Sequence, residues 1–123
     1  MNILDSSGWL EYFTGGPNSK HFSVPLENLE ELLVPTICLY EVFKVVLREA
    51  GEDSAIQAIS LMKQGTIIEV TEEIAVMAAK ISHEQKIPMA DSIILSTAQR
   101  YNATIWTQDT DFKEKPSVKY FPK

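Results

Sequence analysis

The sequence predicts an α/β domain of three layers, with a sheet between layers of helices. Short apolar runs, which are typical of buried strands, alternate along the chain with longer segments of helical periodicity. Strands that are separated by helices pair in parallel, because a helix is the usual crossover between parallel strands. The chain has 123 residues, of which 45% are hydrophobic, so we expect one domain over residues 1–123.

The first half of the chain predicts two strands and three helices. They are a strand at residues 2–4, helices at 6–13 and 20–31, a strand at 32–35 and a helix at 37–49. Glycine and proline at 15–17 separate the first two helices, and Pro25 lies within the second. Thr36 is positioned to cap the third helix and Gly51 to end it.

The second half predicts three more helices and three more strands. They are a helix to about residue 63, a strand at 67–70, a helix opening at 71–74, a helix at 89–101, and strands at 104–107 and 118–121. Asp53 or Ser54 is expected to cap the first of these helices. Glu72 and Glu73 suit the first turn of the next one, and Pro88 separates it from the last.

Acidic side chains fall where strands end and helices begin. Asp5 directly follows the first strand, and Asp109 and Asp111 directly follow the strand at 104–107. Asp91 lies in the first turn of the helix at 89–101, and Glu41 in the second turn of the helix after the second strand. Ligands of open parallel sheets bind beyond the carboxyl ends of the strands. We therefore expect these five acids to meet at one edge of the sheet.

Each acid also has a purely structural interpretation. Asp5 can cap the helix that follows it, and Asp109 can cap the turn at 110–112. Asp91 can be placed for the helix dipole alone. Glu41 can pair with Lys44 three residues on, although its neighbours in the helix are mostly apolar. The functional hypothesis therefore depends on all of the acids occurring together.

Converging carboxylates require a cation or bound protons. Two carboxylates about 5 Å apart repel by roughly 3 kcal/mol at an effective dielectric constant near 20. Ligands that are all oxygen suit Mg²⁺ or Mn²⁺. Such an ion can activate a water molecule for attack on phosphorus, so no side-chain nucleophile is needed. His21 and His83 fall within predicted helices, away from the strand ends, and we assign them no role.

Charge, cysteine content and the lengths of the apolar runs limit the class of protein. The net charge of −6 is unusual for a protein that binds nucleic acid, but without the five candidate acids it would be −1. Cys38 is the only cysteine and lies in an apolar segment, so a buried thiol is expected and a disulfide is excluded. No apolar run reaches the roughly 20 residues that span a membrane, and the first residues do not resemble a signal peptide. We expect a cytoplasmic protein.

Four segments of the chain carry a family resemblance. They are Ile-Leu-Asp-Ser-Ser at 3–7, Leu-Tyr-Glu-Val at 39–42, Ile-Pro-Met-Ala-Asp-Ser-Ile-Ile at 87–94 and Thr-Gln-Asp-Thr-Asp-Phe at 107–112. By these motifs, their order and their spacing over essentially the whole chain, the sequence resembles the PIN domain. Within that family it resembles the VapC-type toxins of prokaryotic toxin–antitoxin pairs.

The resemblance implies a parallel five-stranded sheet and endonucleolytic cleavage of RNA that leaves a 5′-phosphate. By it, Asp5 and Asp91 would be the principal Mg²⁺ ligands, Glu41 and Asp109 would complete the set, and Asp111 would support it. Ser7 and Thr107 match small hydroxyl positions that orient the first acid or the water network. The resemblance also implies a homodimer and an antitoxin that inserts a segment into the active-site groove.

Three further sets of residues bear on the predicted RNA and protein contacts. Many relatives have a basic residue where this chain has Gln108, so one phosphate contact is in question. Lys44 and Arg48, one turn apart on the helix of Glu41, are either replacement RNA contacts or ordinary surface charges. The aromatic residues Trp9, Tyr12 and Phe13 belong either to the core or to a contact with the antitoxin or a second subunit.

Three other classes of protein are alternatives to a nuclease. A HAD-type phosphatase has a second Asp two residues after the first, where this chain has Ser7. A response-regulator receiver needs an Asp after its third strand, where this chain has Thr71-Glu72-Glu73. The third rival is a PIN-like module that binds RNA or protein without catalysis, and only an activity measurement distinguishes it from a nuclease.

Overall fold

The computed structural model describes residues 1–123 and contains a five-stranded sheet in which all strands are parallel. The strands are β1 (Asn2–Leu4), β2 (Leu32–Pro35), β3 (Thr66–Ile68), β4 (Thr104–Thr107) and β5 (Val118–Tyr120). Their order across the sheet is β3-β2-β1-β4-β5. Central β1 pairs with β2 on one side and with β4 on the other, with Ile3 opposite both Leu33 and Ile105. The predicted α/β fold is confirmed.

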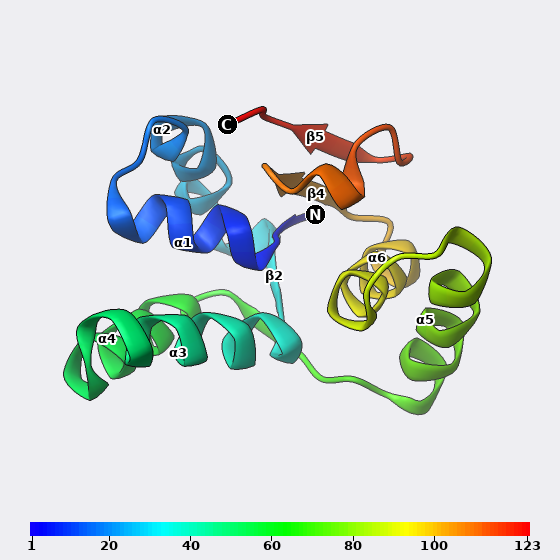
Figure 1. The fold of residues 1–123 in the computed structure, drawn as a ribbon, viewed down its shortest axis with the longest axis horizontal. Coiled ribbons are helices and arrows are strands. Elements are labelled where there is room, and N and C mark those ends of the chain that lie inside the picture. Colours follow the sequence, from blue (N-terminus) through cyan, green and yellow to red (C-terminus); the bar gives the residue numbers. More distant parts are fainter.

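Six α-helices flank the sheet, and most of them lie in pairs (Figure 1). They are α1 (Ser6–Thr14), α2 (Ser19–Ser23), α3 (Thr36–Ala50), α4 (Glu52–Met62), α5 (Glu72–Gln85) and α6 (Met89–Tyr101). In Figure 1 the α3–α4 pair and the α5–α6 pair are well separated, and the N-terminal end of α3 is the end turned toward α6. None of the helices is long and apolar enough to cross a membrane.

The chain direction across the sheet reverses between β1 and β4. From β1 the chain proceeds outward to β2 and β3, then crosses back to β4 and continues to β5. In parallel sheets this switch point is where ligands bind, just beyond the carboxyl ends of the two strands. Asp5 follows β1 and Asp109 follows β4, so two of the predicted acids lie at the switch point.

The hydrophobic core shows where Trp9 and Cys38 lie. Trp9 is only 1% exposed and belongs to the main hydrophobic cluster, whereas Tyr12 and Phe13 are half-buried against it. Trp9 is therefore a core residue and does not form a surface contact. Cys38 is fully buried in the same cluster, as expected.

The segment expected as one helix at residues 20–31 is three short pieces. Helix α2 ends at Ser23, and two turns of 3-10 helix follow, η1 (Pro25–Glu27) and η2 (Leu29–Glu31). Pro25 has no backbone N–H and its ring clashes with the preceding turn, so it cannot continue an α-helix and instead starts η1. The prediction of a continuous helix was wrong because the apolar periodicity continues across this proline.

Two predicted helix starts and one strand are also displaced. Thr36 is the first residue of α3 and Pro35 precedes it as the N-cap, without a side-chain cap. Helix α4 begins at Glu52 after Gly51, so neither Asp53 nor Ser54 caps it. Strand β3 ends at Ile68, two residues before the expected end, because only the first residues of that run pair with β2.

Candidate active site

Asp5 lies at the end of the central strand, where it caps α1. Its Oδ1 accepts a hydrogen bond of 2.9 Å from the backbone N–H of Gly8. The Ser7 hydroxyl lies 2.8 and 2.9 Å from the two carboxylate oxygens, and the Thr107 hydroxyl donates to Oδ2 over 2.6 Å. The structural interpretation of Asp5 as a helix cap is thus correct, and the same contacts fix its carboxylate at the switch point.

Burial dominates the protonation equilibrium of Asp5. The residue is 2% exposed, and this burial raises the pKa of its carboxyl from the usual 3.8 to about 6. Hydrogen bonds from Thr107, Gly8 and Ser7 act in the opposite direction, and the negative charge of Asp109 raises the pKa further. Asp5 therefore retains a proton well above the pH at which an exposed aspartate loses it.

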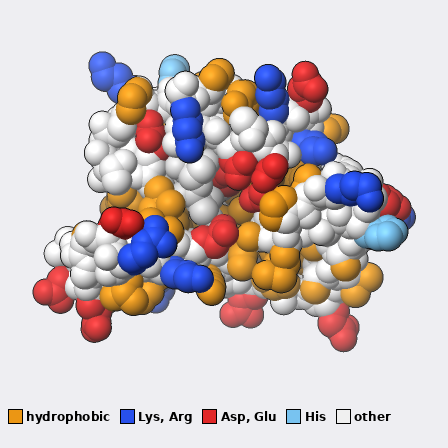
Figure 2. Space-filling view, in the orientation of Figure 1, with side chains coloured by type: hydrophobic (Ala, Val, Ile, Leu, Met, Phe, Trp, Pro, Cys, Tyr) orange, Lys and Arg blue, Asp and Glu red, His pale blue; other side chains and the backbone are white.

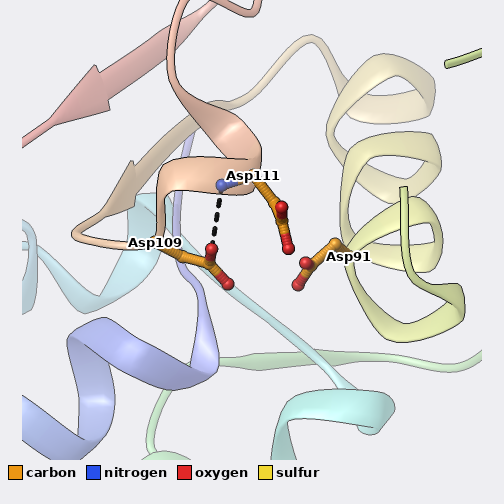
Figure 3. Close-up of side chains that lie close together, drawn as sticks. All are labelled: Asp91, Asp109 and Asp111. Carbon is orange, nitrogen blue, oxygen red and sulfur yellow. Dashed lines mark hydrogen bonds between the residues drawn. The ribbon is translucent and has the colours of Figure 1, made fainter. Parts of the chain in front are cut away.

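Asp91, Asp109 and Asp111 form a compact carboxylate cluster (Figure 3). Each of the three offers an oxygen that lies within 4.8 Å of the others. Asp109 caps the 3-10 turn η3 (Thr110–Phe112), because its Oδ1 accepts a bond of 2.9 Å from the backbone N–H of Asp111. Asp91 points at this turn from the start of α6. The turn after β4 thus presents two acids to a third that comes from a different helix.

The proton affinity of Asp91 reflects this crowding. Burial and the negative charge of Asp109 raise the pKa of its carboxyl from 3.8 to about 8, with further contributions from Asp111 and Asp5. A proton shared in this cluster takes the place that a cation can occupy.

Glu41 approaches from α3 and is held by α1. Its Oε1 accepts a hydrogen bond of 2.6 Å from the hydroxyl of Ser6, the residue that follows Asp5. Glu41 and Lys44 do not form an ion pair. The Lys44 ammonium lies instead over the Tyr40 ring, 5.7 Å from its centroid. Arg48 pairs instead with its neighbour Glu49. The sequence offered no signal for Ser6, because 35 residues separate it from Glu41.

Asp5 and Glu41 lie outside the compact cluster of Asp91, Asp109 and Asp111, but the charges of the acids influence one another and a shared neighbour. Asp5, Glu41 and Asp91 all act on the buried thiol of Cys38, whose pKa is raised by burial first and by these charges in addition. Asp109 in turn acts on both Asp5 and Asp91. None of the three ion pairs of the protein involves these acids. Figure 2 shows acidic side chains gathered at the centre of this face. The site therefore carries concentrated negative charge that no basic side chain neutralises.

Gln108 occupies the position where many relatives have a basic residue, and its side chain turns away from the carboxylate cluster. Its side chain is buried, and its amide oxygen accepts a hydrogen bond of 3.0 Å from Asn18. Its amide nitrogen lies 3.4 Å from a carboxylate oxygen of Glu11. Gln108 therefore contacts the connection between α1 and α2, and its amide does not face the carboxylate cluster.

Comparison with known proteins identifies a matching family and solved structures of similar fold. The model of the PIN domain matches residues 3–117. No curated protein matches the chain. Among solved structures, a toxin–antitoxin complex from Klebsiella pneumoniae is 22% identical with a TM-score of 0.84, and the match covers 100% of both chains. VapC20 of Mycobacterium tuberculosis, described as a toxin that cleaves the sarcin-ricin loop, is 16% identical with a TM-score of 0.79 over 96% of this chain and 97% of that one.

FitAcB from Neisseria gonorrhoeae gives a third match of the same kind. It is 23% identical, with a TM-score of 0.76, over 99% of this chain and 98% of that one. At these identities the likeness concerns the fold, and it extends over at least 97% of each compared chain.

Proposed function

The chain belongs to the PIN domain family, and from that premise we propose that it is a Mg²⁺-dependent endoribonuclease that acts as the toxin of a toxin–antitoxin pair. One observation carries the proposal above all. Carboxylate oxygens of Asp91, Asp109 and Asp111 lie within 4.8 Å of one another, and no basic side chain pairs with them. A nuclease that uses metal ions needs such an arrangement, whereas a domain that only binds RNA gains nothing from it.

The residues present fit a hard divalent cation. Every donor is a carboxylate oxygen, which Mg²⁺ and Mn²⁺ prefer. The raised pKa values of Asp5 and Asp91, about 6 and about 8, mean that protons relieve the repulsion when no cation is bound. In this proposal Asp5, Glu41, Asp91 and Asp109 hold the ion. Asp111 supports it, because its backbone N–H fixes the Asp109 carboxylate.

When bound, a divalent ion would lower the pKa of a coordinated water molecule and would stabilise negative charge at phosphorus. The chain supplies orientation and a proton acceptor. Ser7 and Thr107 fix both oxygens of Asp5. Ser6 occupies Oε1 of Glu41, which leaves Oε2 to accept a proton from the attacking water. The new bond would join the water oxygen to phosphorus while the P–O3′ bond breaks, and the departing 3′ oxygen would take a proton from solvent water, so the products are a 5′-phosphate and a 3′-hydroxyl.

RNA binding is assigned to α3. This helix carries Glu41 into the site, and Lys44 and Arg48 follow on its exposed side. Figure 2 shows basic side chains gathered over this helix, beside the central acids. Phosphates that approach the acids would meet these charges first, which supports a role in positioning the RNA backbone.

An apolar groove that contains none of the site acids offers the proposed antitoxin a contact in addition to the active-site groove. It lies between α1, α3 and α4, with a volume of about 490 Å³. Its apolar lining comes from Leu10, Phe13, Val45, Val46, Ala58 and Leu61. An apolar segment of an antitoxin would bury this surface, and solved structures of toxin–antitoxin complexes are among the proteins of like fold. The proposed homodimer is a separate claim, and sedimentation of a monomer at micromolar concentration would remove it.

The experiment compares cleavage with binding. Purified protein is incubated with a panel of structured RNAs in Mg²⁺, in Mn²⁺ and in EDTA, and the chemistry and sequence of the new ends are determined. The proposal predicts cleavage only with a divalent ion and ends that carry a 5′-phosphate. RNA retention without cleavage in either ion would instead support the non-catalytic binding module.

A further inference from the structure

Three polar side chains form a closed hydrogen-bond ring beside the acidic cluster but outside it. Gln108 Oε1 accepts from the Asn18 side chain over 3.0 Å, and Gln108 Nε2 donates to Glu11 Oε1 over 3.4 Å. The ring closes where the backbone N–H of Asn18 donates to Glu11 Oε2 over 2.9 Å. We call these three residues the amide ring.

The amide ring can form in only one orientation. A carboxylate only accepts hydrogen bonds and an amide NH₂ only donates them, so the oxygen of Gln108 must face Asn18 and its nitrogen must face Glu11. Gln108 is 7% exposed, and a buried amide that loses its partners is costly. Gly16 packs against the Glu11 carboxylate so closely that a Cβ there would overlap it. The side chain of Gln108 is therefore fixed from two sides.

Gln108 joins two residues that the site uses. Thr107, before it, donates to Asp5, and the backbone N–H of Asp109, after it, donates to the Thr107 hydroxyl over 2.9 Å. The backbone N–H of Gln108 itself points at Ser7 Oγ, 3.3 Å away. The main chain is thus held from the Asp5 side, while the amide ring holds the same peptide from the opposite side.

We propose that Gln108, fixed by Asn18 and Glu11, is a positioning residue that sets where Asp109 presents its carboxylate to the metal ion. The inference depends on the proposed metal-dependent function. Outer residues that orient a metal ligand typically contribute about 10-fold to 100-fold in metal affinity or activity. Loss of the amide ring lets the peptide of Asp109 move, so the affinity for the ion falls while the side chains that bind it remain.

The test is calorimetric titration of Mn²⁺ into the full chain and two variants. Gln108→Met keeps the volume of the side chain and removes both of its hydrogen bonds. Asn18→Ala removes the bond between Asn18 and Gln108 from the other side, together with the bonds that the Asn18 amide donates to the carbonyls of Phe121 and Pro122. Each variant is expected to weaken Mn²⁺ binding about 10-fold or more. The rate of RNA cleavage should return toward that of the unmodified chain at saturating Mn²⁺, which a merely structural defect would not allow.

Gln99→Met provides the matched control, because Gln99 is exposed on α6 and belongs to no part of the site. It should bind Mn²⁺ as the unmodified chain does. Mn²⁺ affinity within twofold of the unmodified chain in Gln108→Met and Asn18→Ala, whatever their thermal stability, would overturn the positioning role alone. Absence of Mn²⁺ binding and of cleavage in the unmodified chain would overturn the proposed function together with this inference.

Discussion

Thr107 donates its hydroxyl hydrogen to Asp5 over 2.6 Å, although 102 residues separate them in the chain. The same hydroxyl oxygen accepts the backbone N–H of Asp109. Thr107→Val keeps the shape and removes both bonds, so we expect a loss of about 1–3 kcal/mol in the free energy of unfolding. Urea denaturation measures it, with Thr107→Ser as the control that keeps the hydroxyl. Equal stability of the valine and serine variants would contradict this account of Asp5.

The metal-free protein should become less stable as the pH rises. The folded state raises the pKa of Asp5 to about 6 and that of Asp91 to about 8, so it binds more protons than the unfolded chain, in which both are near 3.8. This contribution to stability is complete at about pH 4 and is lost progressively up to about pH 8. For buried Asp5 alone, the change is on the order of 3 kcal/mol.

Chemical denaturation in EDTA at several pH values measures this loss. Added Mg²⁺ should stabilise the protein more at about pH 8 than at about pH 4, because at the higher pH protons no longer compete with the ion for the carboxylates. Stability that rises between about pH 5 and about pH 8 in EDTA would show that the acids are not crowded as the structure has them.

Gly8 allows α1 to begin against β4. A Cβ at this position would come 3.1 Å from the Phe22 ring and 3.3 Å from the backbone oxygen of Trp106. Gly8→Ala should therefore shift the start of α1, with a loss of about 1–3 kcal/mol from overpacking. Because the Gly8 N–H donates to the Asp5 carboxylate and helps to fix it, RNA cleavage should fall as well. Thermal unfolding and a cleavage assay of the same sample check both parts, and unchanged stability would indicate that Phe22 moves aside freely.

Lys44 and Arg48 should affect RNA binding and leave the chemical step intact. Both are exposed on α3, and neither forms an ion pair with the site acids. The double variant Lys44→Ala/Arg48→Ala should raise KM several-fold at unchanged kcat. RNA affinity should also depend less steeply on salt concentration, by the equivalent of up to about two phosphate contacts. Lys63→Ala, on the exposed end of α4, serves as the control. A fall in kcat without a change in KM would move these residues out of the binding role.

The sequence predicted the layout of the site well, because that layout follows from topology. Once β1 and β4 are recognised as buried strands, the acids directly after them must emerge at one edge of a parallel sheet. The exact bounds of α6 and β4 were also predictable, since Pro88 precedes the helix and an apolar run defines the strand. Pro25 misled the prediction of the second helix because periodicity alone does not register a missing N–H.

What the sequence could not give is the pairing of distant polar groups. The hydroxyl of Ser6 on Glu41, and the amide of Gln108 between Asn18 and Glu11, join segments 35 to 97 residues apart. Asp111 was expected in the turn that Asp109 caps, and the structure places it in the cluster with Asp91 because η3 turns its side chain toward α6. Such contacts depend on side-chain directions that only the folded chain fixes.

The most direct test of the central claim is the rate of RNA cleavage by Asp91→Asn in Mg²⁺ and in Mn²⁺. Asparagine keeps the shape and removes the charge, so the account predicts a loss of at least about 100-fold, which corresponds to about 3 kcal/mol of transition-state stabilisation. The variant should also be more stable than the unmodified chain in EDTA at about pH 8, because the repulsion among Asp91, Asp109 and Asp111 is relieved. Cleavage that survives the substitution in a well-folded variant would contradict the account.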